Sequence, residues 1–233
     1  MAGPDLTAGD LELRGRVPWS SNATFIGEIA VEGSPPRTVV YKPVRGERPL
    51  WDFPPGTLHC RELAAFVVSE ALGWGIVPAT VIRDGPHGPG MVQDFVDHDP
   101  DENYFTLLEA RPQRFRAFAA FDMIVNNADR KGGHCLRGPD GHIWGIDHGL
   151  TFHTDDKLRT VIWDFAAEEV PSALVDDVCR LLADFDRVVQ PVLVPLLTAE
   201  EIGAVRKRCE ALAAAGHFPV PDAGHHSVPW PLV

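Results

Sequence analysis

Apolar and β-branched residues alternate with polar ones in three segments near the start of the chain, at residues 11–17, 24–33 and 37–44. The turn sequences SSN and GSPP separate these segments, so the pattern predicts three strands of an antiparallel meander. Two further runs, at 76–85 and 87–96, predict two more strands around a turn. The first part of the chain is therefore expected to be rich in β-structure.

One helix is predicted within this strand-rich part. Residues 58–72 place Leu63, Phe66 and Val67 near one face at helical spacing. Gly73 follows directly and is the kind of residue that ends a helix. The proline-rich sequence RPLWDFPPGT, which precedes the helix, predicts a loop.

Helical periodicity dominates the second half of the chain. It predicts helices at residues 113–128 and 171–185 and a third that starts at Thr198. Thr198 with Glu201 three residues later is a capping-box pattern, and Gly216 marks the end of that helix.

Two other features of the second half are not helical. Residues 134–147 predict a hairpin with its turn at 139–141. Residues 217–233 are rich in proline and predict an irregular tail.

The composition is that of an ordinary globular protein. The chain has 233 residues, of which 45% are hydrophobic, enough for one core or for two small lobes around a cleft. Its apolar runs, at 64–72 and 192–197, are shorter than the roughly 20 residues of a membrane span, so we expect no stable membrane insertion. The N-terminal sequence has no basic start followed by an apolar core, which favours a cytoplasmic protein.

Charge and cysteine spacing exclude further classes. The formal net charge is −12, from 33 acidic residues against 21 Lys and Arg, and such a field repels nucleic acid, so we expect no nucleic-acid partner. The basic clusters at 111–116 and 205–209 are expected to be solvated faces of helices. The four cysteines are far apart and form no CxxC pair, which is typical neither of a zinc ribbon nor of a disulfide scaffold.

The sequences NNADRKGGHCL and IDHGL contain the candidate chemistry. Asp129 is followed by Arg130 and Lys131, which favour its ionised form, so it can orient a hydroxyl and accept its proton. Asp147 follows the apolar segment HIWGI, where a strand gives way to a turn, a suitable place to present a carboxylate to a divalent cation. The predicted hairpin between them would bring the two carboxylates together.

Phosphoryl transfer uses such a pair, because one carboxylate positions the attacking oxygen and the other holds the metal. The same chemistry needs a strand lysine for the phosphates of the nucleotide and a helical acid to hold that lysine. Lys42 in VVYKP and Glu62 in the predicted helix supply these residue types.

In this order, the motifs YKP, REL, DRKGGH and IDHGLTF resemble the protein-kinase-like superfamily, most closely its atypical branch of phosphatidylinositol 3-/4-kinase-like and HipA-like proteins. The resemblance implies a two-lobed α+β fold with a strand-rich N-lobe at 8–96, a helical C-lobe at 97–216 and an irregular tail at 217–233. It also implies that ATP and Mg²⁺ or Mn²⁺ bind between the lobes and that the partner is a hydroxyl-bearing substrate of unknown class.

The same resemblance implies roles for individual residues. Lys42 would contact the α- and β-phosphates and pair with Glu62. Asp129 would be the catalytic aspartate, Lys131 would neutralise the γ-phosphate, and Asp147 would bind the metal. The remaining nucleotide contacts would come from the turn that replaces a glycine-rich loop and from the hinge beside adenine, namely Ser20, Ser21, Asn22, Thr24, Gln93, Asp94 and Phe95.

Two histidines depart from the pattern. His134 stands five residues after Asp129, where the superfamily has a metal-binding asparagine, and His148 follows Asp147. Mg²⁺ prefers oxygen ligands, so His134 would be a poor ligand for a second Mg²⁺. Three alternatives follow. Asn126 or Asn127 supplies the missing ligand, the enzyme uses one metal or prefers Mn²⁺, or activity is weak or lost.

Two other interpretations stay open. One is a catalytically weak or inactive kinase-like protein that binds nucleotide. The other is a metal-dependent hydrolase with a site formed by His134, His142, His148, His153, Asp129 and Asp147. The sequence also leaves open whether a phosphoryl or an adenylyl group is transferred.

Overall fold

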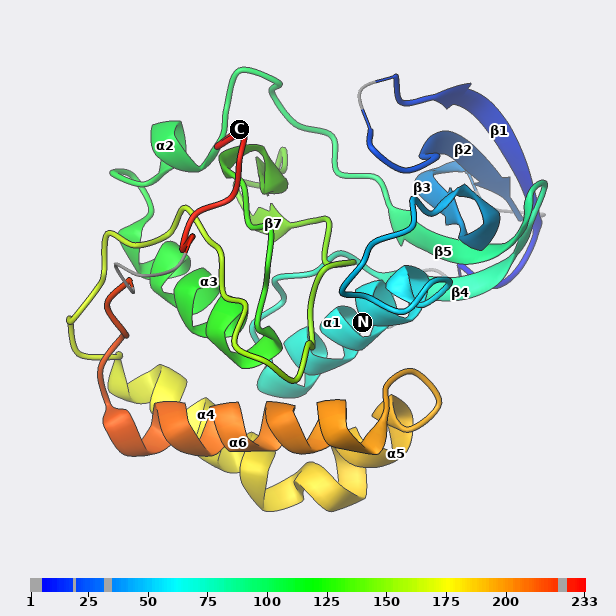
Figure 1. The fold of residues 1–233 in the computed structure, drawn as a ribbon. Helices are drawn as coiled ribbons and strands as arrows, with labels where there is room; N and C mark the ends of the chain where they lie inside the picture. Colours follow the sequence, from blue (N-terminus) through cyan, green and yellow to red (C-terminus); the bar gives the residue numbers. More distant parts are fainter. Residues whose placement is uncertain (1–5, 19, 32–34, 222–225) are drawn as a thin grey trace.

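A five-stranded antiparallel sheet forms the N-terminal part of the molecule (Figure 1). Its spatial order is β1-β2-β3-β5-β4, so neighbouring strands are connected as a meander followed by a hairpin. The strands are β1 (Asp10–Arg16), β2 (Phe25–Ala30), β3 (Arg37–Pro43), β4 (Thr80–Gly85) and β5 (Gly88–Asp94). The meander predicted from the sequence is confirmed.

The computed structural model of the chain describes residues 6–18, 20–31, 35–221 and 226–233. The predicted strand at 24–33 ends at Ala30, and its last two positions lie outside the described residues. So do the first two residues of the GSPP turn.

The two faces of the sheet have different roles. Val39 and Tyr41 of β3 are fully buried in a small core that also contains Val92. Because side chains alternate along a strand, Lys42 points to the opposite face. Lys42 pairs across the ladder with Met91 of β5, and both residues line a cavity that α1 also borders. The face of the sheet that carries Lys42 therefore borders this cavity.

The helix α1 (Leu58–Leu72) has the bounds predicted from the sequence. Gly73 ends it in the left-handed conformation with φ +75°, which glycine adopts without the strain of a Cβ. Its buried residues, among them Ala64, Val68 and Leu72, belong to the large core of the helical half. The helix therefore fixes the sheet against the rest of the molecule.

The helical half contains the remaining elements (Figure 1). They are α2 (Tyr104–Leu107), α3 (Pro112–Val125), η2 (Gly132–His134), β6 (Cys135–Arg137), β7 (Ile143–Gly145), α4 (Ser172–Asp184), the π-helical turn η3 (Phe185–Val189), α5 (Gln190–Leu193) and α6 (Ala199–Ala215). One short turn, η1 (Val44–Gly46), lies outside this half, between β3 and α1. The predicted hairpin is β6–β7, and the capping box of Thr198 and Glu201 starts α6 as predicted.

The helix predicted at 113–128 ends three residues early. Asn126 adopts the left-handed conformation with φ +52°, and its backbone N–H caps α3. An asparagine tolerates this conformation better than most residues. The early end releases the residues that carry Asp129 into a loop.

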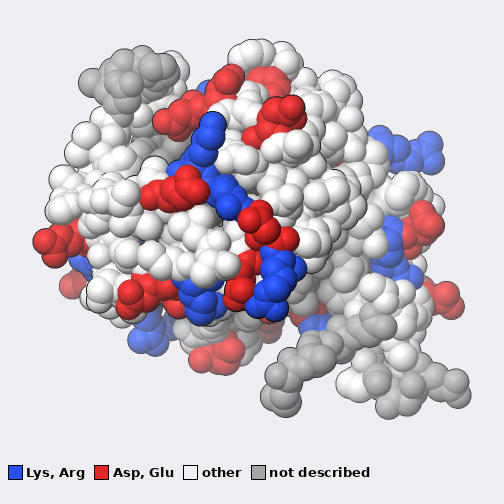
Figure 2. Space-filling view, turned by 90° about the horizontal axis from the view of Figure 1, so that it is seen from below, with Lys and Arg blue, Asp and Glu red and all other residues white. Residues whose placement is uncertain are grey.

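The C-terminal tail is irregular in the part that the structure describes. In residues 217–221 and 226–233 no helix or strand forms, although His217 makes an isolated bridge with Glu169. No helix in the described part of the chain has the length and apolar character needed to cross a membrane. Figure 2 views the molecule from below, and acidic and basic side chains are interspersed over that face.

The two basic clusters differ from the expected solvated faces. Arg114 donates hydrogen bonds to three backbone carbonyl groups, at Trp74, Gly75 and Ile143. Arg208 similarly donates to the carbonyl of Ile124 at 2.8 Å. These arginines hold the fold together, because one guanidinium can donate to several carbonyl groups at once.

Candidate active site

A cavity of about 440 Å³ lies between the sheet, α1 and the loops of the helical half. Its lining includes Lys42, Glu62, Asp129 and Asp147, which come from four separate parts of the sequence. The four motif residues predicted to act together therefore border one cavity.

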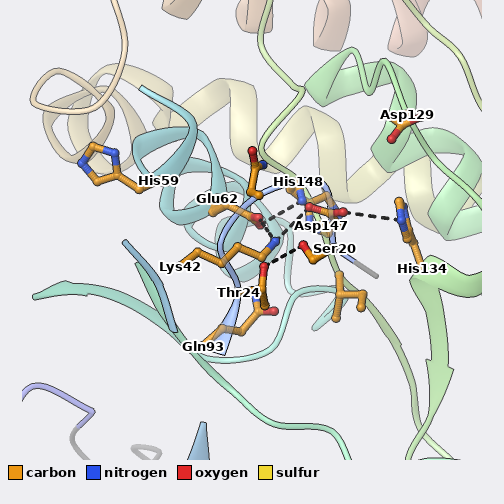
Figure 3. Close-up of polar contacts among 12 residues, drawn as sticks. Ser20, Thr24, Lys42, His59, Glu62, Gln93, Asp129, His134, Asp147 and His148 are labelled. Atoms are coloured by element: carbon orange, nitrogen blue, oxygen red, sulfur yellow. Dashed lines mark hydrogen bonds and ion pairs between the residues drawn. The ribbon is translucent and has the colours of Figure 1, made fainter. Parts of the chain in front are cut away.

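Lys42 is the centre of the polar contacts in this cavity (Figure 3). Its Nζ donates a 2.6 Å hydrogen bond to Glu62 Oε1 and a 2.8 Å hydrogen bond to Asp147 Oδ1. The second carboxylate oxygen of Glu62 accepts the backbone N–H of His148 at 2.8 Å. One buried glutamate thus holds both the lysine and the turn that follows Asp147.

These contacts keep Lys42 and Asp147 charged, whereas burial raises the pKa of Glu62 against the effect of Lys42. Burial alone would lower the pKa of Lys42, but the carboxylates of Asp147 and Glu62 outweigh it and raise the pKa above its ordinary value. The charge of Lys42 holds the pKa of Asp147 well below its usual range. Asp147 is therefore an ionised carboxylate, and its side chain is 46% exposed, so it remains accessible from the cavity.

Asp147 itself has unusual backbone geometry. It follows β7 and adopts the left-handed conformation with φ +60°. A non-glycine residue in this region is strained, and such strain is concentrated at functional sites. Gly149 lies close to α1, where an added Cβ would be 3.5 Å from the Leu58 Cβ. The turn therefore passes close to the helix that carries Glu62.

Asp129 lies in the loop released by the early end of α3. Its backbone N–H donates to Asn127 Oδ1 at 3.0 Å, and Lys131 Nζ lies 3.4 Å from its Oδ2. Burial raises the pKa of Asp129, and the charge of Lys131 opposes this effect. The structure places Lys131 beside the carboxylate that it was predicted to accompany.

The two asparagines before Asp129 are engaged elsewhere. Asn126 Nδ2 donates to the carbonyl groups of His153 and Asp155, and its Oδ1 accepts the N–H of Lys157. Asn127 Nδ2 donates to Asp122 Oδ1, and its Oδ1 accepts the N–H of Asp129. Both amides therefore hold loops in place.

His134 lies beside Asp147, with Nε2 3.5 Å from Asp147 Oδ2. Its Nδ1 accepts the N–H of Lys131 at 3.4 Å, so the hydrogen-bond network assigns the proton to Nε2. Burial lowers the pKa of His134 to about 4, which makes the ring neutral at pH 7. In this tautomer the protonated Nε2 of His134 lies 3.5 Å from Asp147 Oδ2.

The arginine of the DRKGGH motif was not among the predicted site residues. Arg130 is fully buried and binds Asp122 through Nε and Nη2, at distances of 3.1 Å and 2.9 Å to Oδ1. It also donates to the carbonyl of Ile146 and to His148 Nε2. Arg130 thus connects the loop of Asp129 to the turn of Asp147. Asp122 at the end of an apolar helical pattern was the signal that could have suggested a buried partner.

The predicted phosphate-binding turn borders the cavity in part. Ser20, Ser21 and Asn22 line it, and Ser20 Oγ lies 2.8 Å from Thr24 Oγ1. Thr24 is buried and supports the turn from behind without lining the cavity. Asn22 Oδ1 accepts the backbone N–H of Arg48, so its amide closes one side of the cavity.

The predicted hinge residues are Gln93, Asp94 and Phe95. All three are described by the structure, and none of them lines the cavity. Gln93 is buried, and its Nε2 donates to Thr80 Oγ1 at 2.9 Å. Asp94, the last residue of β5, forms an ion pair with Arg37, the first residue of the adjacent strand β3. Phe95 is 38% exposed. Met91, on the same strand, lines the cavity, because it pairs with Lys42.

Sequence reasoning also missed the loop between β3 and α1. Glu47, Arg48, Leu50 and Trp51 line the cavity beside the serine turn, together with His59 of α1. Glu47 Oε1 accepts the N–H of His59, and the two side chains form an ion pair with 3.4 Å between His59 Nδ1 and Glu47 Oε1. The composition of this segment predicts a loop, but nothing in it predicts where the loop lies.

The residues of the alternative metal site are dispersed. Among the described residues, no group of three or more His, Cys, Asp or Glu side chains lies together in a way that could hold a metal ion. His142 contacts Gly75 O and Arg114, whereas His153 Nδ1 accepts the N–H of Asp155. The histidines therefore belong to different local networks.

Asp147 fits the divalent cation that the resemblance implies. It offers an ionised, half-exposed carboxylate, and hard cations such as Mg²⁺ bind carboxylate oxygen. His134 fits less well, because coordination through Nε2 requires its proton to move to Nδ1 and the contact with the Lys131 N–H to break.

Known structures have the same fold. The proinflammatory kinase CtkA of Helicobacter pylori superposes with a TM-score of 0.51 at 11% identity, over 91% of this chain and 94% of that chain. Fam20 of hydra, solved with a sugar, gives a TM-score of 0.53 at 13% identity, over 90% of this chain and 85% of that chain. The chain therefore has a protein-kinase-like α+β fold with a β-sheet N-lobe and a helical C-lobe, as predicted.

Sequence comparisons identify a relative whose name describes no activity. No protein-family model matches the chain. Protein Rv2133c of Mycobacterium tuberculosis is 41% identical over 97% of this chain and 93% of its own length. At this identity and coverage, the chain belongs to the same family as protein Rv2133c.

Proposed function

We propose that the chain is an ATP-dependent phosphotransferase that moves the γ-phosphoryl group to a hydroxyl acceptor. The observation that carries this proposal is the double contact of Lys42 with Glu62 and Asp147 in the cavity that Asp129 also lines. The kinase-like fold agrees with it. Within that fold, the motifs favour the atypical phosphatidylinositol 3-/4-kinase-like and HipA-like branch, with lobes at 8–96 and 97–216.

Each polar residue has a distinct role in the proposed reaction. Lys42, fixed by Glu62, binds the α- and β-phosphates, and the turn of Ser20 and Ser21 covers them with hydroxyl and N–H groups. Asp147 would hold Mg²⁺ or Mn²⁺, which neutralises charge on the phosphates when bound. The adenine side of the cavity is bordered by Met91.

Asp129 orients the acceptor. The hydroxyl oxygen forms a bond to the γ-phosphorus, the bond from that phosphorus to the β,γ-bridging oxygen breaks, and ADP leaves. The hydroxyl proton passes to Asp129, whose pKa is raised by burial and therefore closer to that of a useful base. Lys131, 3.4 Å from Asp129, would neutralise the γ-phosphoryl group.

The test is an incubation of purified protein with ATP labelled at either the α or the γ position, with Mg²⁺ or Mn²⁺. Movement of the γ label to an acceptor, or to the protein itself, supports phosphoryl transfer. Movement of the α label would establish adenylyl transfer instead. A variant with Asp129→Ala is the matched control, because it keeps the groups that bind nucleotide.

The second candidate is a nucleotide-binding protein without transfer activity. The tautomer of His134 favours it, since the protonated Nε2 faces Asp147 where the superfamily has an asparagine ligand. Stabilisation by metal and ATP in a thermal shift assay, without movement of either label, would identify this function.

A further inference from the structure

The tail lies against the loop that carries Asp129. The backbone N–H of Gly132 donates a 2.7 Å hydrogen bond to the carbonyl oxygen of Leu232. A Cβ at Gly133 would be 3.6 Å from Val233 Cγ1. In Figure 1 the end of the chain, drawn in red, reaches α2 and the helical turn η2. The last residues therefore contact the segment that directly follows the proposed catalytic aspartate.

A second anchor holds the start of this tail segment, residues 226–233. The carbonyl oxygen of Ser227 accepts the N–H of Thr160 at 3.1 Å and the indole N–H of Trp163 at 2.9 Å. Thr160 is also joined to Arg130 by a parallel bridge. The tail segment thus spans the surface from the 160–163 segment to the loop after Asp129.

The glycines of DRKGGH make this contact possible. A Cβ at Gly132 would be 2.9 Å from the Phe105 ring and 3.3 Å from the Leu232 carbonyl oxygen. Without that side chain, an extended backbone can lie directly on the loop and accept its N–H. Main-chain hydrogen bonds of this kind do not depend on the sequence of the segment that makes them.

The tail segment is held weakly. Pro229 is buried, but Trp230 is 87% exposed and Val233 is 60% exposed. The segment therefore buries little apolar surface, and a few hydrogen bonds to the loop and to Trp163 hold it. Segments with few buried contacts open at low free energy, so another chain can replace this one.

We propose that residues 226–233 occupy the surface on which a polypeptide acceptor lies, and that they inhibit phosphoryl transfer until they are displaced. This inference rests on the proposed phosphotransferase function. An extended chain that presents a hydroxyl to Asp129 passes the N–H of Gly132, which the tail segment now uses. Leu232 and Val233, the residues beside the loop, carry no hydroxyl, so the segment blocks the surface without being a substrate there.

The first experiment locks the tail segment in place with Gly133→Cys and Val233→Cys in the full chain. The exposed Cys179 is replaced with Ser to prevent pairing between molecules. After oxidation with diamide we expect transfer from γ-labelled ATP to short peptides with a central serine or threonine to fall at least tenfold. Reduction should restore it, while the thermal shift with ATP stays equal in both states. Gly133→Cys alone should show no such response to reductant.

The second experiment loosens the tail segment. Trp163→Phe removes the indole N–H that binds Ser227 but keeps an aromatic ring, and kcat/KM for the peptides should rise about threefold to fivefold, the effect of one hydrogen bond. KM for ATP should not change. The synthetic peptide His-Ser-Val-Pro-Trp-Pro-Leu-Val should inhibit this variant competitively with the acceptor peptide and not with ATP.

The outcomes separate the two proposals. Equal transfer by the oxidised and reduced double variant, or cysteines that stay unpaired under diamide, would overturn the role of the tail segment alone. Movement of the γ label to no acceptor at all, neither peptide nor the protein itself, in wild type or any variant would overturn the phosphotransferase function, and the acceptor surface with it.

Discussion

Arg130 donates a 2.6 Å hydrogen bond from Nη2 to His148 Nε2, and both side chains are fully buried. A guanidinium can only donate, so Nε2 is the acceptor and the imidazole is neutral with its proton on Nδ1. Burial lowers the pKa of His148 well below its ordinary value, and the charge of Arg130 adds to this effect. The pair connects the loop of Asp129 to the turn of Asp147 through side chains that never reach the cavity.

This pair makes His148 a positioning residue. His148→Leu removes the acceptor and leaves part of the buried guanidinium of Arg130 unsatisfied, so we expect the free energy of unfolding to fall by about 1–3 kcal/mol. His148→Asn retains an oxygen acceptor and should lose less than half as much. Denaturant unfolding of both variants measures the difference. Equal losses in the two would show that the hydrogen bond has no special weight.

Lys42 is expected to contribute to stability as well as to nucleotide binding. Lys42→Met leaves Glu62, whose side chain is 3% exposed, without its cation. We expect destabilisation of about 3 kcal/mol, because removal of one partner strands a buried charge. The double variant Lys42→Met with Glu62→Gln should recover most of this loss, since the amide oxygen can still accept the His148 N–H.

The activity of these two variants provides the contrast. Neither should bind ATP normally or transfer phosphate, although the double variant is nearly as stable as the wild type. Chemical denaturation and an ATP thermal shift measure the two properties independently. A double variant as unstable as Lys42→Met would contradict the ion-pair explanation.

Asp129→Asn tests the proposed base. The amide is similar in size and keeps the loop, but it cannot accept the hydroxyl proton, so kcat should fall by about 10²–10⁴. Nucleotide binding should be retained, because Lys42, Glu62 and Asp147 are unchanged. Single-turnover transfer of the γ label measures kcat, and unchanged turnover would remove Asp129 from its proposed role.

Local patterns in the sequence were sufficient for the five strands of the sheet, for α1 and for the start of α6. The bounds of α1 and its end at Gly73 follow from helical spacing and a glycine stop, and the capping box of α6 is a property of adjacent residues. The prediction that Lys42 and Asp147 share one site came from the resemblance of the ordered motifs to kinases, and not from a local pattern.

Features that depend on tertiary packing could not be predicted in this way. Gln93 and Asp94 are adjacent on β5 and therefore point to opposite faces of the sheet. Which residues of β5 face the cavity depends on how β5 pairs with β3, and no local pattern specifies this register. The buried pair of Arg130 and Asp122 consists of two charged residues that look like surface residues until α3 is packed. The loop beside the cavity is positioned by long-range contacts, such as the ion pair of Asp52 with Lys157.

His134 predicts a pH dependence of stability. Its pKa is lowered to about 4 in the folded chain, against about 6.5 for an ordinary histidine, so only the unfolded chain binds this proton between those values. The free energy of unfolding should therefore fall as the pH drops from 6.5 toward 4, with about 2 kcal/mol lost between pH 7 and pH 5.

The matched control is His134→Asn, which does not titrate. The free energy of unfolding of the wild type minus that of the variant should decrease by this amount as the pH falls from 7 to 5, because the other titrating groups contribute equally to both proteins. Urea unfolding at several pH values measures it. Parallel stability curves for the two proteins would contradict a buried, neutral imidazole.

The same variant decides what the histidine does to metal use. In the wild type the protonated Nε2 of His134 lies 3.5 Å from Asp147 Oδ2, so the ring supplies no free lone pair on that side. Asn offers an oxygen that Mg²⁺ prefers. If His134 limits activity, His134→Asn should raise the ratio of the rate with Mg²⁺ to the rate with Mn²⁺ by about tenfold. Changes to a metal ligand, or to a residue that supports one, have effects of about this size. Transfer of the γ label measured in each metal gives this ratio. An unchanged ratio with retained activity would mean that Asp147 and the phosphates alone select the metal.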